Sequence, residues 1–344
     1  MKILIAGAGI GGLTMARMAT IAGHDVVVAE RAPRVRADGA GILLDRAALA
    51  TLSSAGFDLQ GLGRPLTTMA ITTSAGAERG AVRGRSSFAR EELVAELARG
   101  AGTVAEIQVG SPVRDVVDEG DHVRCTVAGR TVTVDLVIGA DGLLSTVRAA
   151  VDPRARVRET GQVCWRGIVE MDAGSQGTEL WNGVERIGVV PLLGGRTYVY
   201  VVRAHTAPGE GLGQRSALPA RERTALSLLS GLPEDHVLRH EVRELERPSW
   251  GRGRVLLLGD AAHALTPNLG LGAALAVDDA AVIAAALDDP SMLSRRYRVR
   301  RHRVVRATQL LSRQLGSLAH DQGPVARLAR AAAGLNRSSP GVTS

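Results

Sequence analysis

The stretch KILIAGAGIGG at residues 2–12 decides the fold of this chain. Its first five residues predict a buried parallel strand, and the residues after the first glycines show helical spacing over 10–22. A second apolar strand is expected over 25–29, ending at Glu30. Together these elements predict one βαβ unit of an α/β sheet.

The glycine pattern Gly7-x-Gly9-x-x-Gly12 indicates a binding site for a dinucleotide. The first glycine makes the turn from strand to helix, the second lets the backbone approach a pyrophosphate, and the third allows close helix–strand packing. The helix N-terminus adds positive potential and free N–H groups. Glu30 is placed to accept hydrogen bonds from an adenosine ribose. The alternative is a packing turn that binds nothing.

A second strand-to-turn segment runs from residue 135 to 142 and places Asp141 at its turn. Ser145 and Arg148 follow Asp141 at i+4 and i+7, so we expect one helical face to carry all three. This arrangement predicts a second contact with the ligand. The alternative is a capped helix with a surface arginine.

A third such segment, residues 254–263, contains the turn Gly259-Asp260 and continues to Pro267, Gly270 and Gly272. An aspartate at a strand end can hold the hydroxyls of a sugar-like chain, and the helix N-terminus beyond it favours negative charge. Three such turns predict one long, anionic, hydroxylated ligand that is touched at three places. A capping acid and an ordinary helix start are the alternative.

Composition restricts the classes of function. The chain has 344 residues and a net charge of +7, and Lys2 is its only lysine. The arginines are scattered without interleaved aromatic residues, which argues against a nucleic-acid partner. Two cysteines without metal-type spacing predict a reduced, cytoplasmic protein with no metal site. The N-terminus does not resemble a signal peptide, and Asp278-Asp279 interrupt the apolar stretch 271–287, so we expect no membrane span.

The order of the three segments resembles the aromatic-hydroxylase family of FAD-dependent monooxygenases, the group typified by para-hydroxybenzoate hydroxylase. The resemblance covers nearly the whole chain. Other landmarks appear in the family order, and they are Gly41-Ile42, Arg90-x-x-Leu93, Trp165-Arg166-Gly167, Val190-Pro191-Leu192 and Gly194-Gly195.

The resemblance implies an α/β fold with a Rossmann-like FAD-binding domain, an interleaved antiparallel-sheet substrate domain and C-terminal helices. We expect the FAD-binding domain to comprise 1–65, 89–160 and 248–290. The substrate domain is expected at 66–88 and 161–247, followed by C-terminal helices over 291–335 and a disordered tail at 336–344. Within this scheme the residue pattern predicts a single strand over 131–138.

The resemblance also implies the cofactor and the residues that hold it. FAD would be the bound cofactor and NAD(P)H a transient co-substrate, because the chain has no second dinucleotide fingerprint. The implied cofactor-binding residues are Gly7, Gly9, Gly12, Glu30, Arg31, Arg90, Asp141, Asp260, Pro267, Gly270 and Gly272. Family members often carry Gln and Asn in the last turn, where this chain has Leu271 and Ala274.

The family chemistry implies that a flavin C4a-hydroperoxide, formed with O2, hydroxylates a small aromatic or polyketide-like substrate. Catalytic side chains are unknown, with His263, Arg46 and Tyr200 as candidates. Further residues that could meet the substrate are Trp165, Arg166, Trp181, Tyr198, Arg203 and His205. A turn or packing role is the alternative for His263 and for most of these residues.

Other functions remain open from the sequence. The same fold could carry a flavin oxidase or reductase, or a non-redox FAD-containing binding protein or cyclase. A halogenase is disfavoured, because the chain lacks both a Trp-x-Trp-x-Ile-Pro segment and an active-site lysine. We expect a monomer or a homodimer.

Overall fold

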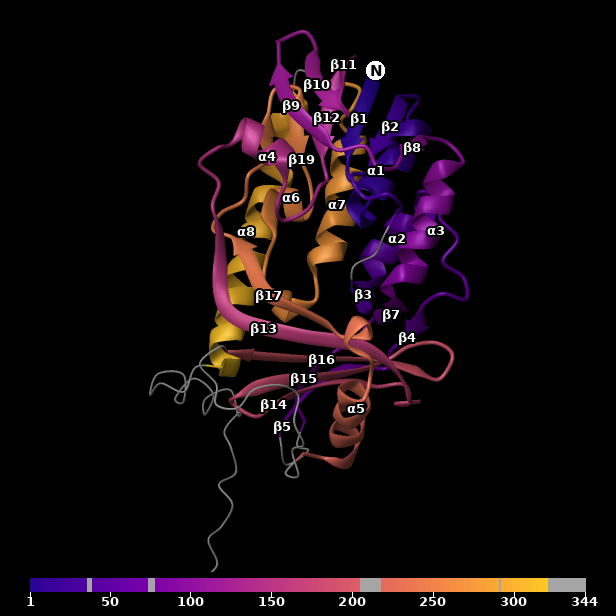
Figure 1. Cartoon of the computed structure of the whole chain (residues 1–344), viewed down its shortest axis with the longest axis vertical. Coiled ribbons are helices and arrows are strands. Elements are labelled where there is room, and N and C mark those ends of the chain that lie inside the picture. The colour runs from indigo at the N-terminus through magenta and orange to yellow at the C-terminus, as the bar shows by residue number, and fades with distance from the viewer. Residues whose placement is uncertain (36–38, 74–77, 205–217, 291, 321–344) are drawn as a thin grey trace, which may run out of the picture.

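A six-stranded sheet forms the centre of the upper part of the molecule (Figure 1). The computed structural model describes residues 1–35, 39–73, 78–204, 218–290 and 292–320. The tail 336–344, the end of the C-terminal segment beyond 320, and His205 lie outside these residues. The strands, in spatial order, are β18 (Gly251–Arg252), β19 (Val255–Leu257), β12 (Leu136–Gly139), β1 (Lys2–Ala6), β2 (Asp25–Ala29) and β8 (Glu106–Gln108).

All neighbours in this sheet are parallel except the short edge strand β18. Parallel pairing brings the carboxyl ends of β1, β2, β12 and β19 to one edge, which is where ligands bind in open α/β sheets. The predicted βαβ unit and parallel sheet are confirmed.

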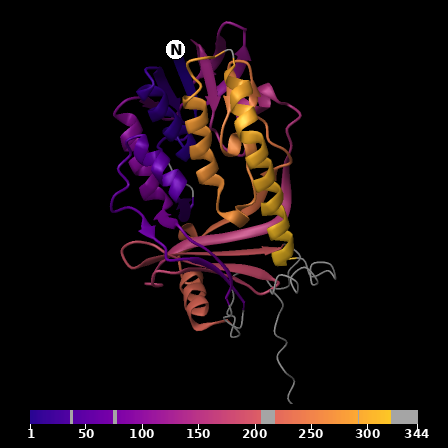
Figure 2. The same cartoon turned by 180° about the vertical axis from the view of Figure 1, so that it is seen from behind.

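Each face of this sheet is covered by its own layer. Ile3 and Ile5 pack against helices, whereas Leu4 and Ala6 point to the opposite core, as the period of two requires. The helical layer contains α1 (Ile10–Ile21), α3 (Arg90–Gly102), α7 (Gly272–Ala284) and α8 (Leu293–His320). The other layer contains β9 (Val113–Asp118), β10 (Val123–Val127), β11 (Arg130–Val134), α4 (Thr146–Val151) and α6 (Asp260–His263). Figure 2 shows α7 and α8 running side by side.

The single strand expected over 131–138 is wrong. The chain leaves the sheet β11-β10-β9 after Val134 and enters the six-stranded sheet at Leu136. Between them, the Asp135 carboxylate accepts a hydrogen bond from the Lys2 backbone N–H at 2.6 Å. This contact with the start of β1 fixes the position where the chain changes sheets, a long-range interaction that an apolar run does not reveal.

A seven-stranded sheet crosses below the α/β part and is antiparallel apart from the β14–β5 pair (Figure 1). Its strands, in spatial order, are β17 (Leu238–Leu245), β13 (Val157–Glu170), β16 (Arg196–Ala204), β15 (Glu185–Pro191), β14 (Gly177–Trp181), β5 (Met69–Thr73) and β6 (Glu78–Val82). Helix α5 (Ala220–Ser230) covers one face through Val199 and Val201. The other face is directed toward the α/β part.

A small sheet joins the two parts. It pairs β3 (Gly41–Asp45) with β7 (Arg85–Ala89) and β7 with β4 (Arg64–Pro65), and α2 (Arg46–Ser54) follows β3 directly. The sequence placed most of β7 in the substrate domain, but this strand pairs with β3. Among the described residues, none of the helices combines the length and apolar character needed to cross a bilayer.

Candidate functional site

The first glycine turn has two glycines that close packing requires and one that faces open space. Gly7 has φ +107°, and a Cβ there would lie 2.5 Å from the Ala140 carbonyl oxygen. A Cβ on Gly12 would lie 2.0 Å from the Gly7 carbonyl oxygen. By contrast, a Cβ on Gly9 would meet nothing within 4 Å. Gly9 therefore leaves room at the N-terminus of α1, which is where a pyrophosphate would lie.

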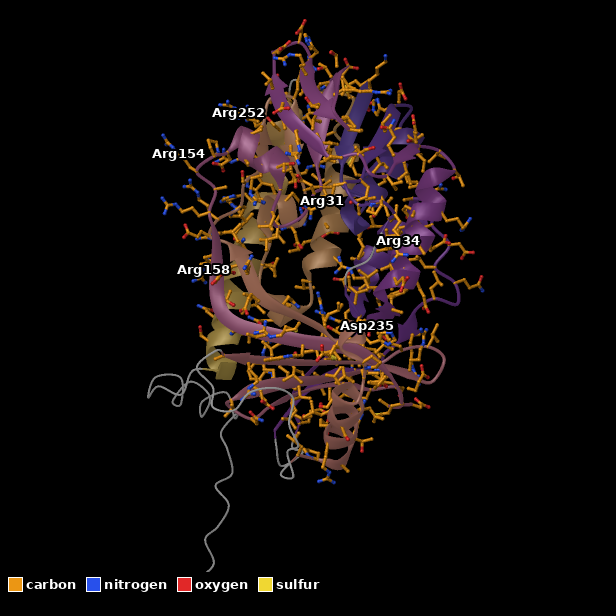
Figure 3. The ribbon with its side chains drawn as sticks, in the orientation of Figure 1. Arg31, Arg34, Arg154, Arg158, Asp235 and Arg252 are labelled. Carbon is orange, nitrogen blue, oxygen red and sulfur yellow. The ribbon has the colours of Figure 1, made fainter. Side chains whose placement is uncertain are left out.

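Glu30 ties the end of β2 to this turn. Its carboxylate accepts hydrogen bonds from the backbone N–H groups of Ala8 and Ala32, both at 2.8 Å. These bonds fix the carboxylate at the edge of the sheet and leave lone pairs for a ribose hydroxyl. Arg31 follows it and is exposed; Figure 3 shows it near the carboxyl end of the parallel sheet.

Asp141 caps α4 with one oxygen and leaves the other without a partner. Oδ2 accepts hydrogen bonds from the Thr146 N–H at 2.7 Å and the Val147 N–H at 3.2 Å, whereas Oδ1 is buried and has no partner among the described residues. A buried orphan acceptor at a strand end fits a ligand donor. The expectation that Asp141, Ser145 and Arg148 share a helical face is wrong, because α4 begins only at Thr146.

Asp260 starts α6 and is exposed. A Cβ on Gly272, the first residue of α7, would lie 4.0 Å from its Oδ1, so the carboxylate and the N-terminus of α7 face the same space. The turn itself is fixed from behind, because the Gly259 N–H donates to Asp279 Oδ2 at 3.0 Å. Asp260 can therefore hold hydroxyl groups at a rigid position.

The turn between Pro267 and Gly272 connects a 3₁₀ turn, η2 (Pro267–Leu269), to α7. Gly270 has φ +61°, a left-handed conformation that glycine adopts without strain. Leu271 is partly exposed, and Ala274 is buried in the helical core. Arg85 of β7 donates to the carbonyl oxygens of Leu269 and Gly270 at 3.0 and 3.4 Å.

Arg90 begins α3, and its side chain passes over Gly39, where a Cβ would meet the Arg90 Cδ at 2.8 Å. The ring of Tyr198 occupies the space that a side chain at Gly41 would need. Arg90 is also close enough to Tyr198 to influence its ionisation. The predicted flavin arginine thus lies where the α/β part meets the seven-stranded sheet.

Strand register decides which substrate candidates face the α/β part. Tyr198, Tyr200 and Arg166 share that face, and the two tyrosine rings lie 5.3 Å apart between centroids. Trp165 pairs with Val201 on the opposite face, where α5 packs. Arg203 also has that parity and pairs with Glu185. Alternation along the strand therefore turns Trp165 and Arg203 away from the α/β part, and their contact with the substrate stays a prediction.

A buried polar network crosses the side of the sheet that faces the α/β part. Glu179 accepts a hydrogen bond from the Tyr200 hydroxyl and another from Trp181 Nε1 at 2.6 Å. Arg186 lies 3.4 Å from Glu179 and donates to the Asn268 side-chain oxygen in η2 at 2.5 Å. Burial, followed by Glu179, holds the pKa of Tyr200 well above its usual value, so the phenol stays protonated. Sequence reasoning missed Glu179 and Arg186, and their i, i+7 spacing across a hairpin gave no signal.

His240 is a half-buried titratable group on this face. It pairs with Cys164 across β17 and β13, and its Nδ1 has no partner among the described residues. Burial and then the Arg166 charge lower its pKa to about 4, while Glu241 has the opposite effect. His240 is therefore neutral at neutral pH. The sequence analysis did not predict a role for His240.

Among the contacts of the described residues, neither His263 nor Arg46 belongs to the network around Glu179. The His263 imidazole is 1% exposed and contacts Asp279, with Nε2 2.5 Å from Oδ2. Asp279 also accepts a hydrogen bond from Arg301 Nε at 2.6 Å. This placement favours a structural role for His263. Arg46 is exposed and packs beside Gly84, and Asp45 caps α2 by accepting from the Ala48 N–H.

The site has the features of a flavin-dinucleotide enzyme of the α/β class. Gly9 leaves space at a helix N-terminus, Asp141 keeps a buried acceptor free, and Asp260 is exposed before a second helix. These features lie at the carboxyl ends of adjacent parallel strands, and they fit the pyrophosphate and hydroxyl groups of FAD.

Comparison with known proteins identifies the family. A family model described as an FAD binding domain matches residues 1–309. The chain therefore belongs to the FAD-dependent monooxygenases that carry this domain, which confirms the resemblance to aromatic hydroxylases and the FAD cofactor.

Three relatives illustrate the match. The chain is 38% identical over 310 residues to 2-heptyl-3-hydroxy-4(1H)-quinolone synthase of Pseudomonas aeruginosa, covering 83% of this chain and 80% of that protein. It is 32% identical over 341 residues to aurachin C monooxygenase/isomerase of Stigmatella aurantiaca, covering 87% and 85%. The structure of Klebsiella pneumoniae HpxO complexed with FAD and uric acid matches with a TM-score of 0.82 and 25% identity, covering 96% and 91%.

Proposed function

We propose that the chain hydroxylates an oxygen-bearing aromatic heterocycle of the quinolone type, with NAD(P)H and O2 as co-substrates. The observation that carries this proposal is the placement of Tyr198 and Tyr200 on the side of the seven-stranded sheet that faces the flavin-binding edge. Two tilted aromatic rings at 5.3 Å form a surface suited to a flat ring. The quinolone named in the 38% identical relative supports the substrate class.

Different residues would bind different parts of the cofactor. The N-terminus of α1 at Gly9 would hold the pyrophosphate, Glu30 the adenosine ribose, and Asp260 the ribityl chain. FAD bound there would supply the redox chemistry for transfer of one oxygen atom from O2 to the ring, with NAD(P)H as the reductant. The seven-stranded sheet would cover the reaction site and exclude water.

Polar groups at the sheet would orient the substrate. Tyr200 is protonated and donates its hydroxyl hydrogen to Glu179, so its oxygen could accept a hydrogen bond from a ring N–H. Arg166 carries a fixed positive charge on the same face, and its Nε is buried without a partner among the described residues. A carbonyl or enolate oxygen would complement this charge.

We further infer a cytoplasmic location. Cys125 and Cys164 are both buried and free. Burial raises the pKa of each thiol to about 11, so neither is a reactive nucleophile. Free buried thiols are typical of a reducing compartment. The expected monomer or homodimer stays a prediction.

The direct test uses the FAD-loaded protein and pairs of candidate substrates that differ only in the ring oxygen. We expect 2-alkyl-4(1H)-quinolones to stimulate NAD(P)H oxidation and to gain one oxygen atom from ¹⁸O2, measured by mass spectrometry. The corresponding quinolines, which lack the ring oxygen, should stimulate it weakly. If quinolones consume NAD(P)H but gain no oxygen, an oxidase or reductase replaces hydroxylation. If only purine or pyridine substrates react, the substrate class is wrong.

A further inference from the structure

Arg85 connects two parts of the molecule that the sequence separates widely. It lies at the start of β7, and its Nη1 donates to the carbonyl oxygens of Leu269 and Gly270 at 3.0 and 3.4 Å. These contacts span 184 and 185 residues of sequence. The guanidinium also packs against the turn, because a Cβ on Gly270 would lie 3.2 Å from Nη1.

The turn that Arg85 contacts needs an external partner. Gly270 adopts φ +61°, a left-handed conformation outside the helical range, just before α7 begins. Positions 271 and 274 carry Leu and Ala, so neither supplies a polar side chain. Asn268 anchors the first half of the turn, with Nδ2 donating to the Ser312 carbonyl at 2.6 Å. Arg85 is the charged donor to the second half.

The surroundings keep Arg85 directed at the turn. Burial lowers its pKa, and the nearby Asp45 carboxylate opposes this effect. Asp45 is the residue opposite Arg85 in the β3–β7 ladder, and Tyr200 is also within electrostatic range. Arg85 Nε is buried and has no partner among the described residues. The turn carbonyls are therefore the hydrogen-bond acceptors found for this guanidinium.

We propose that Arg85 is a positioning residue that holds the turn 267–272 against the flavin and links it to β7 of the small sheet. The proposal rests on the assignment of this turn to the flavin made above. Its charge-assisted bonds would keep the N-terminus of α7 open toward the cofactor. Loss of Arg85 would loosen the turn without removing a group that itself contacts FAD.

The test compares Arg85→Gln with Arg85→Lys and with Arg83→Gln. Arg83 is exposed two residues away and serves as the matched control for loss of one positive charge. FAD affinity is measured by quenching of flavin fluorescence, and the environment of the ring by the visible absorption spectrum. The melting temperature of the FAD-free protein reports folding. None of these measurements needs a substrate.

We expect Arg85→Gln to weaken FAD binding about tenfold and to change the visible flavin spectrum. Arg85→Lys should recover part of the affinity, because an ammonium can still donate to a carbonyl, and Arg83→Gln should match the wild type. Unchanged affinity and spectrum in Arg85→Gln would overturn the proposal. So would a drop in melting temperature of the FAD-free protein that Arg85→Lys does not relieve, because that result marks Arg85 as structural only. If FAD affinity and the flavin spectrum change as expected but the wild-type protein hydroxylates no quinolone, the proposed function is overturned and the role of Arg85 is not.

Discussion

Asp279 and His263 contact each other behind the Gly259-Asp260 turn, with Oδ2 2.5 Å from Nε2. The same carboxylate accepts hydrogen bonds from the Gly259 N–H and from Arg301, and its side chain is fully buried. The turn that presents Asp260 therefore depends on a buried ion pair between α7 and α8. The sequence showed Asp279 only as an interruption of an apolar stretch.

Replacing Asp279 should destabilise the protein strongly. In Asp279→Asn the Arg301 guanidinium would lose its buried partner, which costs about 3–5 kcal/mol in comparable buried pairs. Urea unfolding of the FAD-free protein measures the difference. Asp278→Asn is the matched control, because its side chain is 39% exposed and we expect it to cost less than about 1 kcal/mol. Equal stability of the two variants would contradict the buried-pair interpretation.

Substitutions at Gly12 and Gly9 of the first turn should have different effects, the first on folding and the second on FAD binding. Gly12→Ala would place a Cβ 2.0 Å from the Gly7 carbonyl oxygen, so α1 would have to shift, at a cost of several kcal/mol. Gly9→Ala meets no atom within 4 Å, and its φ of −82° suits alanine. It should leave the melting temperature of the FAD-free protein unchanged but weaken FAD binding at least tenfold. If Gly9→Ala binds FAD normally, the pyrophosphate does not pass this residue.

Asp260 should matter for cofactor binding and not for stability. Its carboxylate is exposed and has no side-chain hydrogen bond among the contacts found in the described residues. Asp260→Ala should change the free energy of unfolding by less than about 0.5 kcal/mol, as for an ordinary surface substitution. FAD titration should show a loss of about tenfold if the residue holds the ribityl hydroxyls. Binding equal to the wild type would remove Asp260 from the site.

His240 should make stability fall in mildly acidic solution. Its folded pKa is about 4 against a reference value of 6.5, so the unfolded chain binds more protons between these values. The stabilisation that comes from neutral His240 is fully present above pH 6.5 and is lost as the pH falls through about 4. It amounts to about 1–2 kcal/mol after allowance for solvent screening.

Chemical denaturation between pH 7 and 4 tests this prediction. His240→Asn should flatten that part of the stability profile, whereas His236→Asn, which changes an exposed histidine, should not. Asp279 affects stability in a lower pH range. Burial alone would raise its pKa, but His263 and Arg301 hold it below 3.8, so its contribution is lost only as the pH falls past that value. A wild-type profile that is flat down to pH 4 would show that His240 ionises freely.

Local signals explain why the cofactor half of the protein was predictable. Gly7 and Gly12 are needed because backbone atoms approach within van der Waals distance, and this need recurs wherever a strand turns into a phosphate-binding helix. Glu30, Asp141 and Asp260 come directly at or after strand ends, and parallel pairing brings those ends to one edge. Both conditions can be recognised within about thirty residues of chain.

The substrate half depended on register, which local patterns do not specify. Trp165 and Arg166 are neighbours in sequence, yet only Arg166 faces the α/β part, because side chains alternate across a strand. Which parity faces inward is set by Tyr198 packing on Gly41 and by Val199 packing under α5. The first of these contacts joins residues more than a hundred positions apart. Alternation along the strand therefore predicted two faces without saying which one lies toward the α/β part.

The amino-acid sequence by itself determined the βαβ unit, the three acidic turns and hence the dinucleotide class, because glycine spacing and strand ends are short-range requirements. Only the tertiary structure decided that Arg85 reaches the turn at Gly270, that Glu179 holds Tyr200, and that His263 contacts the buried Asp279. The physical reason is that a hydrogen bond or ion pair requires two atoms within about 3 Å, a condition set by packing between distant elements.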